Sequence, residues 1–308
     1  MTTAIAVPAS IGNVGPGFDA LSVAVQLYLR VRILDVDPSA VDHLETTFAG
    51  PAPEGGNGIE RAFKLARARA GVAAPGLRVE VSTEIPIRAG LGSSAAASIA
   101  GLRLYESVTA ALTEGDMLSM GCELEGHPDN AAACLLGGLT VSCRQDDGRV
   151  LARPSPWPAR LQFVVATPEI GLATKKARAV LPATVTLDDA VFNLQRALLL
   201  VRAVENERYE DLKEALRDRW HQPGRAALVP GLREALALDH PAILGVCLSG
   251  SGPSIVAFAR PGAERDAAAA LADVYRRIQL PATIRLLAAH QPIGAGLAPS
   301  TLERENTA

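Results

Sequence analysis

The sequence predicts an α+β protein of two domains, and three observations support this. Segments that alternate apolar and polar residues, typical of strands, are interspersed with segments whose apolar residues recur at helical spacing. The stretch RPSPWPAR at 153–160 places three prolines within eight residues and interrupts this pattern. Strands separated by helices, with a hairpin-like return, then predict an α/β sandwich of the split β-α-β type. We therefore expect domains at 1–155 and 156–295 and a frayed polar tail at 296–308.

The first domain is predicted to open with strands at 4–9 and 27–36, joined through the glycine-rich turn IGNVGPGFD. In the second of these strands, Leu27, Leu29 and Val31 alternate with polar residues. The apolar residues of 58–70 recur at helical spacing, and Gly71 follows as a stop, which predicts an amphipathic helix.

The strand LRVEVSTEIPI (77–87) leads next to Gly90 and to a helix expected from Ser93 to about Leu112. Thr113 is predicted to cap a further helix, with Asp116 at the capping-box position, and a strand is expected near 139–144. For the second domain we expect strands near 161–167, 243–249, 254–259 and 283–289, and helices near 173–181, 187–206, 208–219 and 262–278.

Composition excludes several classes of function. The chain has 308 residues, of which 48% are hydrophobic and 20% charged, and its formal net charge is −3. The arginines are scattered, so we expect no nucleic-acid partner. The start MTTAIAVPAS lacks export features and no long uninterrupted apolar stretch occurs, so we expect a cytoplasmic protein with no membrane partner. The spacing of the cysteines predicts reduced, mostly buried thiols at Cys122, Cys134, Cys143 and Cys247.

The segment GLGSSAAAS at 90–98 places two glycines and two serines before an alanine-rich helix. Glycine allows positive φ and close approach of the backbone to a ligand, and Ser93 or Ser94 is expected to cap the helix. The N–H groups of a first helical turn form a phosphate site. A plain strand-to-helix turn is the alternative that this segment alone leaves open.

The sequence contains no G-x-x-x-x-G-K-[ST] loop, so a phosphate site here lacks the loop lysine. Mg²⁺ held by a hydroxyl and a carboxylate can supply the missing charge, and Glu125 and Asp129 are candidate carboxylates. Each candidate site residue, taken singly, also has a structural interpretation. Glu125 and Asp129 can be surface carboxylates, and His127 can be a hydrogen-bonded turn histidine. The segment GSGPS at 250–254 can be a hairpin turn, and Arg178 can lie on a solvated helix face.

Four segments together resemble a known superfamily of kinases. They are PASIGNVGPGFDALSVAV (8–25), IPIRAGLGSSAAAS (85–98), EGHPDNAAACLLGGL (125–139) and LSGSGPSIVAF (248–258). Their order and spacing resemble the galactokinase, homoserine kinase, mevalonate kinase and phosphomevalonate kinase (GHMP) superfamily. The opening segment, with TKKARAVLP (174–182) and HQPGR (221–225), resembles its homoserine kinase branch. The resemblance implies an N-terminal domain like domain 2 of ribosomal protein S5, which binds ATP, and a ferredoxin-like C-terminal α/β sandwich.

The resemblance also implies roles for individual residues. For ATP it implies Pro86, Arg88, Gly90, Leu91, Gly92, Ser93, Ser94 and Ala95, and for Mg²⁺ it implies Ser94 and Glu125. Asn13 and Asp19 are expected to face the substrate ammonium, Arg178 and Arg225 its carboxylate, with His127 nearby. The expected catalytic residues, which orient the hydroxyl, are Asp129, Asn130 and Thr174, and a second glycine loop is expected at Gly250, Ser251 and Gly252.

The activity implied is Mg²⁺-dependent transfer of phosphate from ATP to the side-chain hydroxyl of L-homoserine, a step of threonine biosynthesis, by a homodimeric enzyme. The chain departs from the branch at Ser10, Ile11 and Gly12, where two hydroxyl residues and an alanine are usual, which puts the shape of the amino-acid pocket in question. Two alternative functions remain open: another small-metabolite kinase of the superfamily, and a non-catalytic ligand sensor on the same fold.

Overall fold

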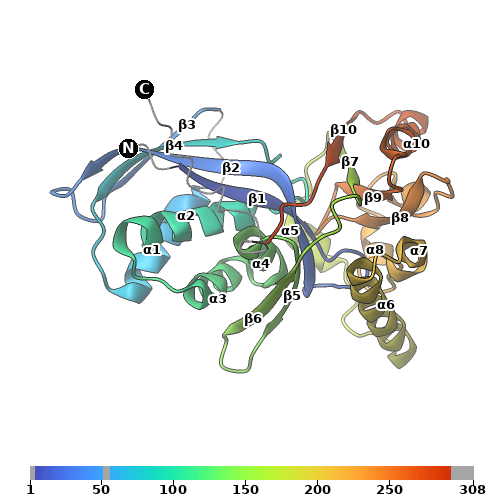
Figure 1. The fold of residues 1–308 in the computed structure, drawn as a ribbon, viewed down its shortest axis with the longest axis horizontal. Helices are drawn as coiled ribbons and strands as arrows, with labels where there is room; N and C mark the ends of the chain where they lie inside the picture. Colours follow the sequence, from blue (N-terminus) through green and yellow to red (C-terminus); the bar gives the residue numbers. More distant parts are fainter. Residues whose placement is uncertain (1–3, 51–55, 293–308) are drawn as a thin grey trace.

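The computed structural model describes residues 4–50 and 56–292, which form the predicted α+β architecture of two domains (Figure 1). The tail predicted at 296–308 lies outside the described residues. A six-stranded sheet with helices forms the first domain, and a four-stranded sheet with helices forms the second. Within the part of the chain described, no helix has both the length and the apolar character needed to cross a bilayer.

The long strand β2 (Leu21–Asp37) organises the sheet of the first domain. β1 (Ala4–Gly12) pairs antiparallel with β2, from Ala4 opposite Arg32 to Gly12 opposite Ser22. On the other edge, β4 (Gly76–Thr83) pairs with the second part of β2 and β5 (Leu139–Arg144) with the first. The alternation that predicts the strand at 27–36 is confirmed, because Leu27, Leu29 and Val31 are buried, but the strand begins six residues earlier.

Two strands of this sheet were not predicted. β3 (Leu44–Phe48) pairs parallel with β4, and β6 (Val150–Ser155) pairs antiparallel with β5. β3 is only five residues long, and β6 contains Pro154, a residue that normally argues against a strand. β6 occupies the edge of the sheet, where an absent N–H donor is tolerated.

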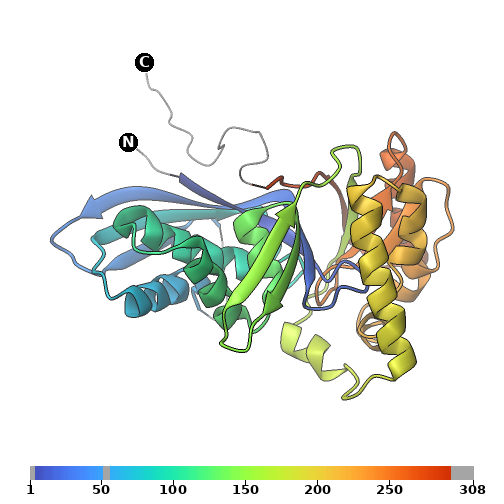
Figure 2. The ribbon, with the colours of Figure 1, turned by 60° about the horizontal axis from the view of Figure 1, so that its bottom comes forward.

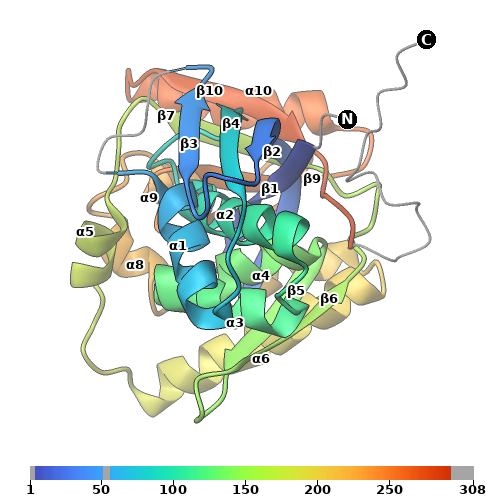
Figure 3. The same cartoon turned by 90° about the vertical axis from the view of Figure 1, so that its left-hand side faces the viewer.

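Four helices cover one face of the sheet: α1 (Gly58–Ala70), α2 (Ser93–Thr109), α3 (Glu114–Glu125) and α4 (Asp129–Leu136), as Figure 3 shows. The capping box predicted at the start of α3 is confirmed, because the side chains of Thr113 and Asp116 each accept the other's backbone N–H. The prediction that Ser93 or Ser94 caps α2 is wrong. The N-cap is Gly92, in the left-handed conformation and without a side-chain hydrogen bond, so both serine side chains lie in the first turn. α2 also ends three residues before Leu112.

The sheet of the second domain has the strand order β10-β7-β9-β8 and is antiparallel throughout. Its strands are β7 (Phe163–Pro168), β8 (Ile243–Leu248), β9 (Ile255–Ala259) and β10 (Ala282–Leu287). Since β7 lies between β10 and β9, the first strand of the domain pairs with its fourth and third, which is the predicted split β-α-β arrangement. The helices are α5 (Thr174–Ala179), α6 (Leu187–Glu205), α7 (Leu212–Ala215), α8 (Gln222–Arg225), α9 (Leu232–Leu236) and α10 (Glu264–Arg277).

The helix predicted over 208–219 is replaced by a 3₁₀ turn (Tyr209–Asp211), the short helix α7 and a tight loop. Asp218 explains the break. Its carboxylate accepts the backbone N–H groups of Trp220, His221 and Gln222 at 2.7–3.0 Å and so organises a turn rather than a longer helix.

The two domains share packing and strand pairing. The ring of Trp157 lies against that of Phe163, with 4.9 Å between centroids, and Phe163 meets Phe258 edge-on at 5.3 Å. All three belong to one hydrophobic cluster that also contains the buried residues of the first sheet. After β10 the chain returns to the first sheet, where Ala289 bridges to Val25 of β2. The strand predicted at 283–289 therefore ends in the second sheet at Leu287 and continues as a pairing with the first.

Gly101 holds α1 and α2 close together, which gives a test of this packing. A Cβ at Gly101 would lie 2.2 Å from the carbonyl oxygen of Ile59, whereas a Cβ at Gly115 in α3 would meet no atom closer than 3.8 Å. We expect Gly101→Ala to lower the free energy of unfolding by about 1–3 kcal/mol or more through overpacking. The control Gly115→Ala is expected to raise it by up to about 1 kcal/mol. Urea titrations of both variants measure this, and equal effects would contradict it.

Candidate active site

A cavity of about 430 Å³ lies where the two domains meet, and segments from both of them line it. Most of the predicted site residues face this cavity: Asn13, Asp19, Arg88, Gly90, Gly92, Ser93, Ser94, Ala95, Glu125, His127, Asp129, Asn130, Thr174, Arg178, Arg225, Gly250 and Ser251. Pro86, Leu91 and Gly252 are not among its lining residues, and Leu91 is instead buried in the core. The structure thus brings together residues that are up to 238 positions apart in the chain, from Asn13 to Ser251.

The loop before α2 has the geometry of an anion site. Gly90 and Gly92 have positive φ angles of 77° and 71°, which favour glycine. Neither tolerates a side chain, because a Cβ at Gly92 would lie 2.0 Å from the Ser10 hydroxyl and one at Gly90 2.4 Å from the carbonyl oxygen of Ser249. The first turn of α2, with its N–H groups and the positive end of the helix dipole, faces the cavity at Ser93, Ser94 and Ala95.

The second glycine loop, Ser249–Ser254, packs directly against the first. The Ser249 hydroxyl donates to the carbonyl of Gly90 at 2.7 Å, and the Ser254 N–H donates to the carbonyl of Ala89 at 3.1 Å. The N–H of Gly250 donates to the carbonyl of Gly12 at 3.0 Å. These bonds fix the C-terminal domain against the loop that precedes α2.

Glu125, the last residue of α3, lies beside the first turn of α2. Its Oε1 accepts hydrogen bonds from the hydroxyl of Ser94 at 3.0 Å and from that of Ser98 at 2.8 Å. A carboxylate and a hydroxyl side by side at the edge of an anion site are the oxygen donors that Mg²⁺ prefers, so this pair fits the ion. Ser98 was missed by the sequence prediction, although its position one turn after Ser94 is a signal that could have found it.

Asp19 and Arg178 form a two-point ion pair within the cavity. The guanidinium donates to the two carboxylate oxygens at 2.6 and 3.0 Å. Arg178 therefore does not belong to the solvated face of α5, which is occupied by the exposed Lys175 and Lys176. Asn13 supports Asp19, because its side-chain oxygen accepts the Asp19 backbone N–H at 3.0 Å. Asn13 and Asp19 both adopt positive φ, at 66° and 55°, so this loop is held in an uncommon conformation.

Arg225 is almost fully buried, with 2% of its surface exposed, and no carboxylate contacts it directly among the described residues. It donates to the carbonyl oxygens of Ala177 and Gly250 and to Nδ1 of His221 at 3.2, 2.9 and 3.1 Å. Burial, and then the charge of Arg178, lowers its pKa to about 10. A buried cation with only neutral partners is an electrostatic cost that an anionic ligand can offset.

His221 positions Arg225 and was not predicted as a site residue, although the HQPGR segment contains it. It is fully buried, and its Nε2 donates to the carbonyl of Gly15 at 2.8 Å. Burial, opposed by the charge of Asp218, lowers the pKa of His221 and keeps the ring neutral. Neutral His221 can then accept the Arg225 proton at Nδ1 while donating at Nε2.

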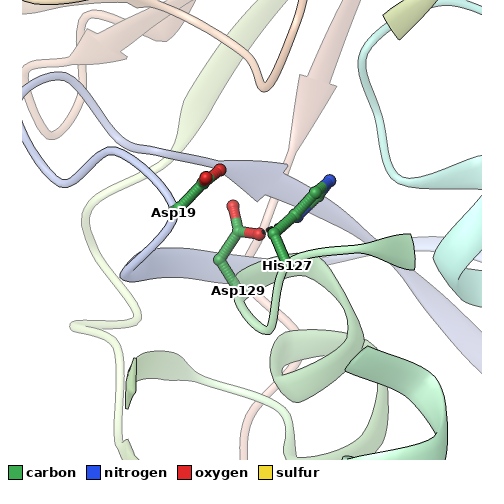
Figure 4. Close-up of side chains that lie close together, drawn as sticks. All are labelled: Asp19, His127 and Asp129. Carbon is green, nitrogen blue, oxygen red and sulfur yellow. Dashed lines mark hydrogen bonds and ion pairs between the residues drawn. The ribbon is translucent and has the colours of Figure 1, made fainter. Parts of the chain in front are cut away.

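His127, Asp129 and Asp19 gather on one side of the cavity, with their polar atoms within 4.8 Å of one another (Figure 4). His127 Nδ1 makes a short hydrogen bond to the buried carboxylate of Asp129. Burial opposes a charge on His127, but the hydrogen bond and charge of Asp129 outweigh it and raise the His127 pKa. Since Asp19 pairs with Arg178 and Asp129 with His127, each carboxylate already has a partner that balances its charge without a metal ion.

The departure at Ile11 and Gly12 has a structural explanation. Ile11 is fully buried in the core and does not line the cavity, so it does not narrow the pocket. Gly12 lies against the catalytic candidates: a Cβ there would be 2.8 Å from the Asn130 amide and 2.9 Å from the Asp129 carboxylate. Ser10 retains a hydroxyl that donates to Asn130 at 2.8 Å.

Part of the cavity wall is formed by residues that were not predicted, mostly apolar: Leu29, Phe48, Asn57, Ile59, Val81, Thr83, Ile85 and Ile87. These residues come from β2, β3 and β4, from the loop after β4 and from the start of α1. Their apolar alternation marks a buried surface in the sequence, but it does not distinguish a cavity wall from a packed core. Among these residues, Asn57 differs because asparagine before a helix is a recognisable N-cap signal in the sequence. Asn57 caps α1 and also faces the cavity.

Comparison with known families agrees with this geometry. The model for the GHMP kinases N terminal domain matches residues 57–138, and that for the GHMP kinases C terminal region matches 200–277. A homoserine kinase from Deinococcus radiodurans is 41% identical over 82% of each chain. A homoserine kinase from Moorella thermoacetica is 37% identical over 92% of this chain and 96% of its own.

Solved structures give the same result for the fold. The crystal structure of a homoserine kinase from Cytophaga hutchinsonii superimposes with a TM-score of 0.80 at 25% identity, covering 94% of this chain and 96% of the other. A galactokinase from Lactococcus lactis shares the fold with a TM-score of 0.71 at 11% identity, covering 94% of both chains. The protein therefore belongs to the homoserine kinase family and, with it, to the ATP-dependent GHMP kinases.

Proposed function

We propose that the protein transfers the γ-phosphoryl group of ATP to the side-chain hydroxyl of L-homoserine, with Mg²⁺, giving ADP and O-phospho-L-homoserine. The O–P bond to the homoserine oxygen forms as the bond between the γ-phosphorus and the bridging oxygen to the β-phosphate breaks, and the hydroxyl proton is released. This is direct in-line transfer without a phosphorylated enzyme. Because the transition state of this transfer is loose, the protein contributes mainly by positioning the two substrates and by neutralising the charge of the phosphates.

The main support for homoserine as the substrate is the Asp19–Arg178 ion pair, which faces the same cavity as buried Arg225. An amino acid has an ammonium and a carboxylate on one carbon atom, so a site for it needs an anion and cations side by side. Asp19 and Arg178 meet that need, and Arg225 adds a second guanidinium facing the same cavity. Galactose carries no charge, and mevalonate has no ammonium group to pair with Asp19.

The remaining residues are proposed to align the reacting groups. The loop Gly90–Ala95, which includes the start of α2, holds the phosphates of ATP, and the apolar part of the cavity wall accepts its base. Ser94 and Glu125 would hold Mg²⁺, which when bound neutralises phosphate charge. Asp129 and Asn130 orient the hydroxyl, with His127 balancing the charge of Asp129 and Thr174 near the second glycine loop, 3.5 Å from the Ser251 hydroxyl.

A substrate screen tests the proposal. ADP release is measured with purified protein and ATP over amino acids, mevalonate, sugars and shikimate. We expect homoserine to give turnover at least about tenfold above any other compound, because it alone combines the zwitterion with a primary hydroxyl at the right distance. A better turnover with mevalonate or a sugar would indicate another kinase of the superfamily, and no turnover with any compound would indicate a ligand sensor.

Replacing the carboxylate of Glu125 tests the metal site. We expect Glu125→Gln to lower kcat by about a hundredfold or more at saturating Mg²⁺, because the ion loses an anionic ligand where charge develops. Glu123→Gln is the matched control, since Glu123 lies on the same helix but is exposed and pairs with Arg69. Steady-state kinetics give both values, and an unchanged kcat for Glu125→Gln would remove this residue from the site.

Truncation of the two arginines tests carboxylate recognition. Arg178→Ala and Arg225→Ala should each cost about 2–5 kcal/mol, or roughly 30-fold to several thousandfold in kcat/KM for homoserine. The KM for ATP should change little. The double variant should cost less than the sum of the single ones, because both guanidinium groups share one carboxylate.

Lys176→Ala, on the exposed face of α5, is the control for Arg178→Ala. The amide analogue of homoserine should be a poor substrate for the wild type and much less sensitive to either arginine substitution. Homoserine kinetics that are unaffected by Arg178→Ala would mean that Arg178 serves only as a partner of Asp19.

A further inference from the structure

The hydroxyl of Ser10 is a buried polar group that has no part in the transfer described above. Ser10 lies near the end of β1, the dark blue strand that runs toward the second domain in Figure 2. It has no exposed surface and does not line the cavity. A Cβ at Gly92 would lie 2.0 Å from its oxygen, and its N–H donates to the carbonyl of Leu91 at 3.1 Å. Ser10 therefore packs directly against the loop before α2.

The same hydroxyl determines how the side-chain amide of Asn130 is turned. Ser10 donates its one hydroxyl proton to Oδ1 of Asn130 at 2.8 Å. The thiol of buried Cys134 donates to the Ser10 oxygen at 3.7 Å, which agrees with this direction of the bond. Asn130 lines the cavity, and its Oδ1 is engaged by a residue outside the cavity. The NH2 group is therefore the end of the amide that is available to a ligand.

Two further contacts favour this orientation of the amide. Nδ2 of Asn130 donates to the carboxylate of Asp129 at 3.4 Å, and an amide turned by 180° would place its oxygen beside that carboxylate instead. A Cβ at Gly12 would lie 2.8 Å from both Nδ2 and Oδ1, so the amide rests on the backbone of β1. The bond from Ser10 is shorter than the bond to Asp129, so we expect its loss to loosen the amide.

We propose that Ser10 is a positioning residue, whose hydroxyl holds the Asn130 amide with an N–H group directed at the reacting oxygen atoms. An N–H group can orient the lone pair of an oxygen and offset negative charge on the phosphoryl group, whereas an amide oxygen would repel both. Asn130 then serves as a hydrogen-bond donor and not as the acceptor of the hydroxyl proton. The inference rests on the proposed phosphoryl transfer and specifies how one of its residues is held.

A double-mutant cycle tests whether Ser10 acts through Asn130. Steady-state kinetics are measured for Ser10→Ala, Asn130→Ala and the double variant, with the acceptor that gives the highest turnover in the substrate screen. We expect Ser10→Ala to lower kcat by about tenfold to a hundredfold, because the amide is no longer held in place. The KM for ATP should change little. The double variant should be no slower than Asn130→Ala alone.

Ser22→Ala is the matched control for the loss of a buried hydroxyl. Ser22 lies opposite Gly12 in β2 and is also fully buried, but its hydroxyl donates to the carbonyl of Ile11 at 3.0 Å. Ser22→Ala should therefore lower the melting temperature, measured by circular dichroism, and leave kcat unchanged.

Three results with an active wild type would overturn the role of Ser10. They are an unchanged kcat for Ser10→Ala, a raised KM for ATP as its only effect, and a double variant slower than Asn130→Ala by the full factor of Ser10→Ala. An acceptor better than homoserine would overturn only the choice of substrate, because the cycle is measured with whichever acceptor works. Absence of turnover with every acceptor would overturn the proposed function and this inference with it.

Asn130→Asp tests which end of the amide acts. Aspartate keeps an oxygen for the Ser10 hydroxyl but has no N–H to donate. We expect its kcat to be no higher than that of Asn130→Ala at the same pH. A kcat for Asn130→Asp well above that of Asn130→Ala would overturn the assignment of the N–H group as the one that faces the reactants.

Discussion

The geometry of the candidate active site depends on the backbone of one residue, Gly250. Its N–H donates to the carbonyl of Gly12 at the end of β1, and its carbonyl accepts from the side chains of Asn13 and Arg225. The same loop bonds to the backbone before α2 through Ser249 and Ser254. The loop before α2, the loop that carries Asp19, and Arg225 are therefore all held by a single turn, which explains why groups from both domains converge on one cavity.

The charges of the site are balanced unevenly, and this imbalance is informative. Asp19 and Asp129 each have a partner that offsets their charge, whereas Arg225 is buried among carbonyl oxygens and a neutral histidine. Burying a guanidinium in this way opposes folding unless further groups compensate, and the lowered pKa of about 10 expresses the same cost. Departures from favourable packing of this kind are expected at functional sites, and the carboxylate of the proposed substrate would supply the missing anion.

The sequence predicted a residue's role best where that role depends only on its residue type and its neighbours in the chain. Glycines that need positive φ at 90 and 92, and the capping residues Thr113 and Asp116, could be predicted because their requirements are local. His221 and the apolar wall of the cavity could not, since a buried residue has the same pattern whether it packs, positions a neighbour or faces a ligand. The strands β3 and β6 were missed because a short edge strand, or one with Pro154, departs from the usual signals.

The return of the chain to the first sheet links the order of synthesis to the order of folding. The backbone groups of Ala24 and Gln26 in β2 bond to residues 288–290, which are made more than 260 residues later. During translation, this stretch of the central strand therefore exposes an unpaired edge until the whole second domain has emerged from the ribosome. An unpaired edge of this kind is a site for pairing with another chain, and it is covered only once residues 288–290 have been made.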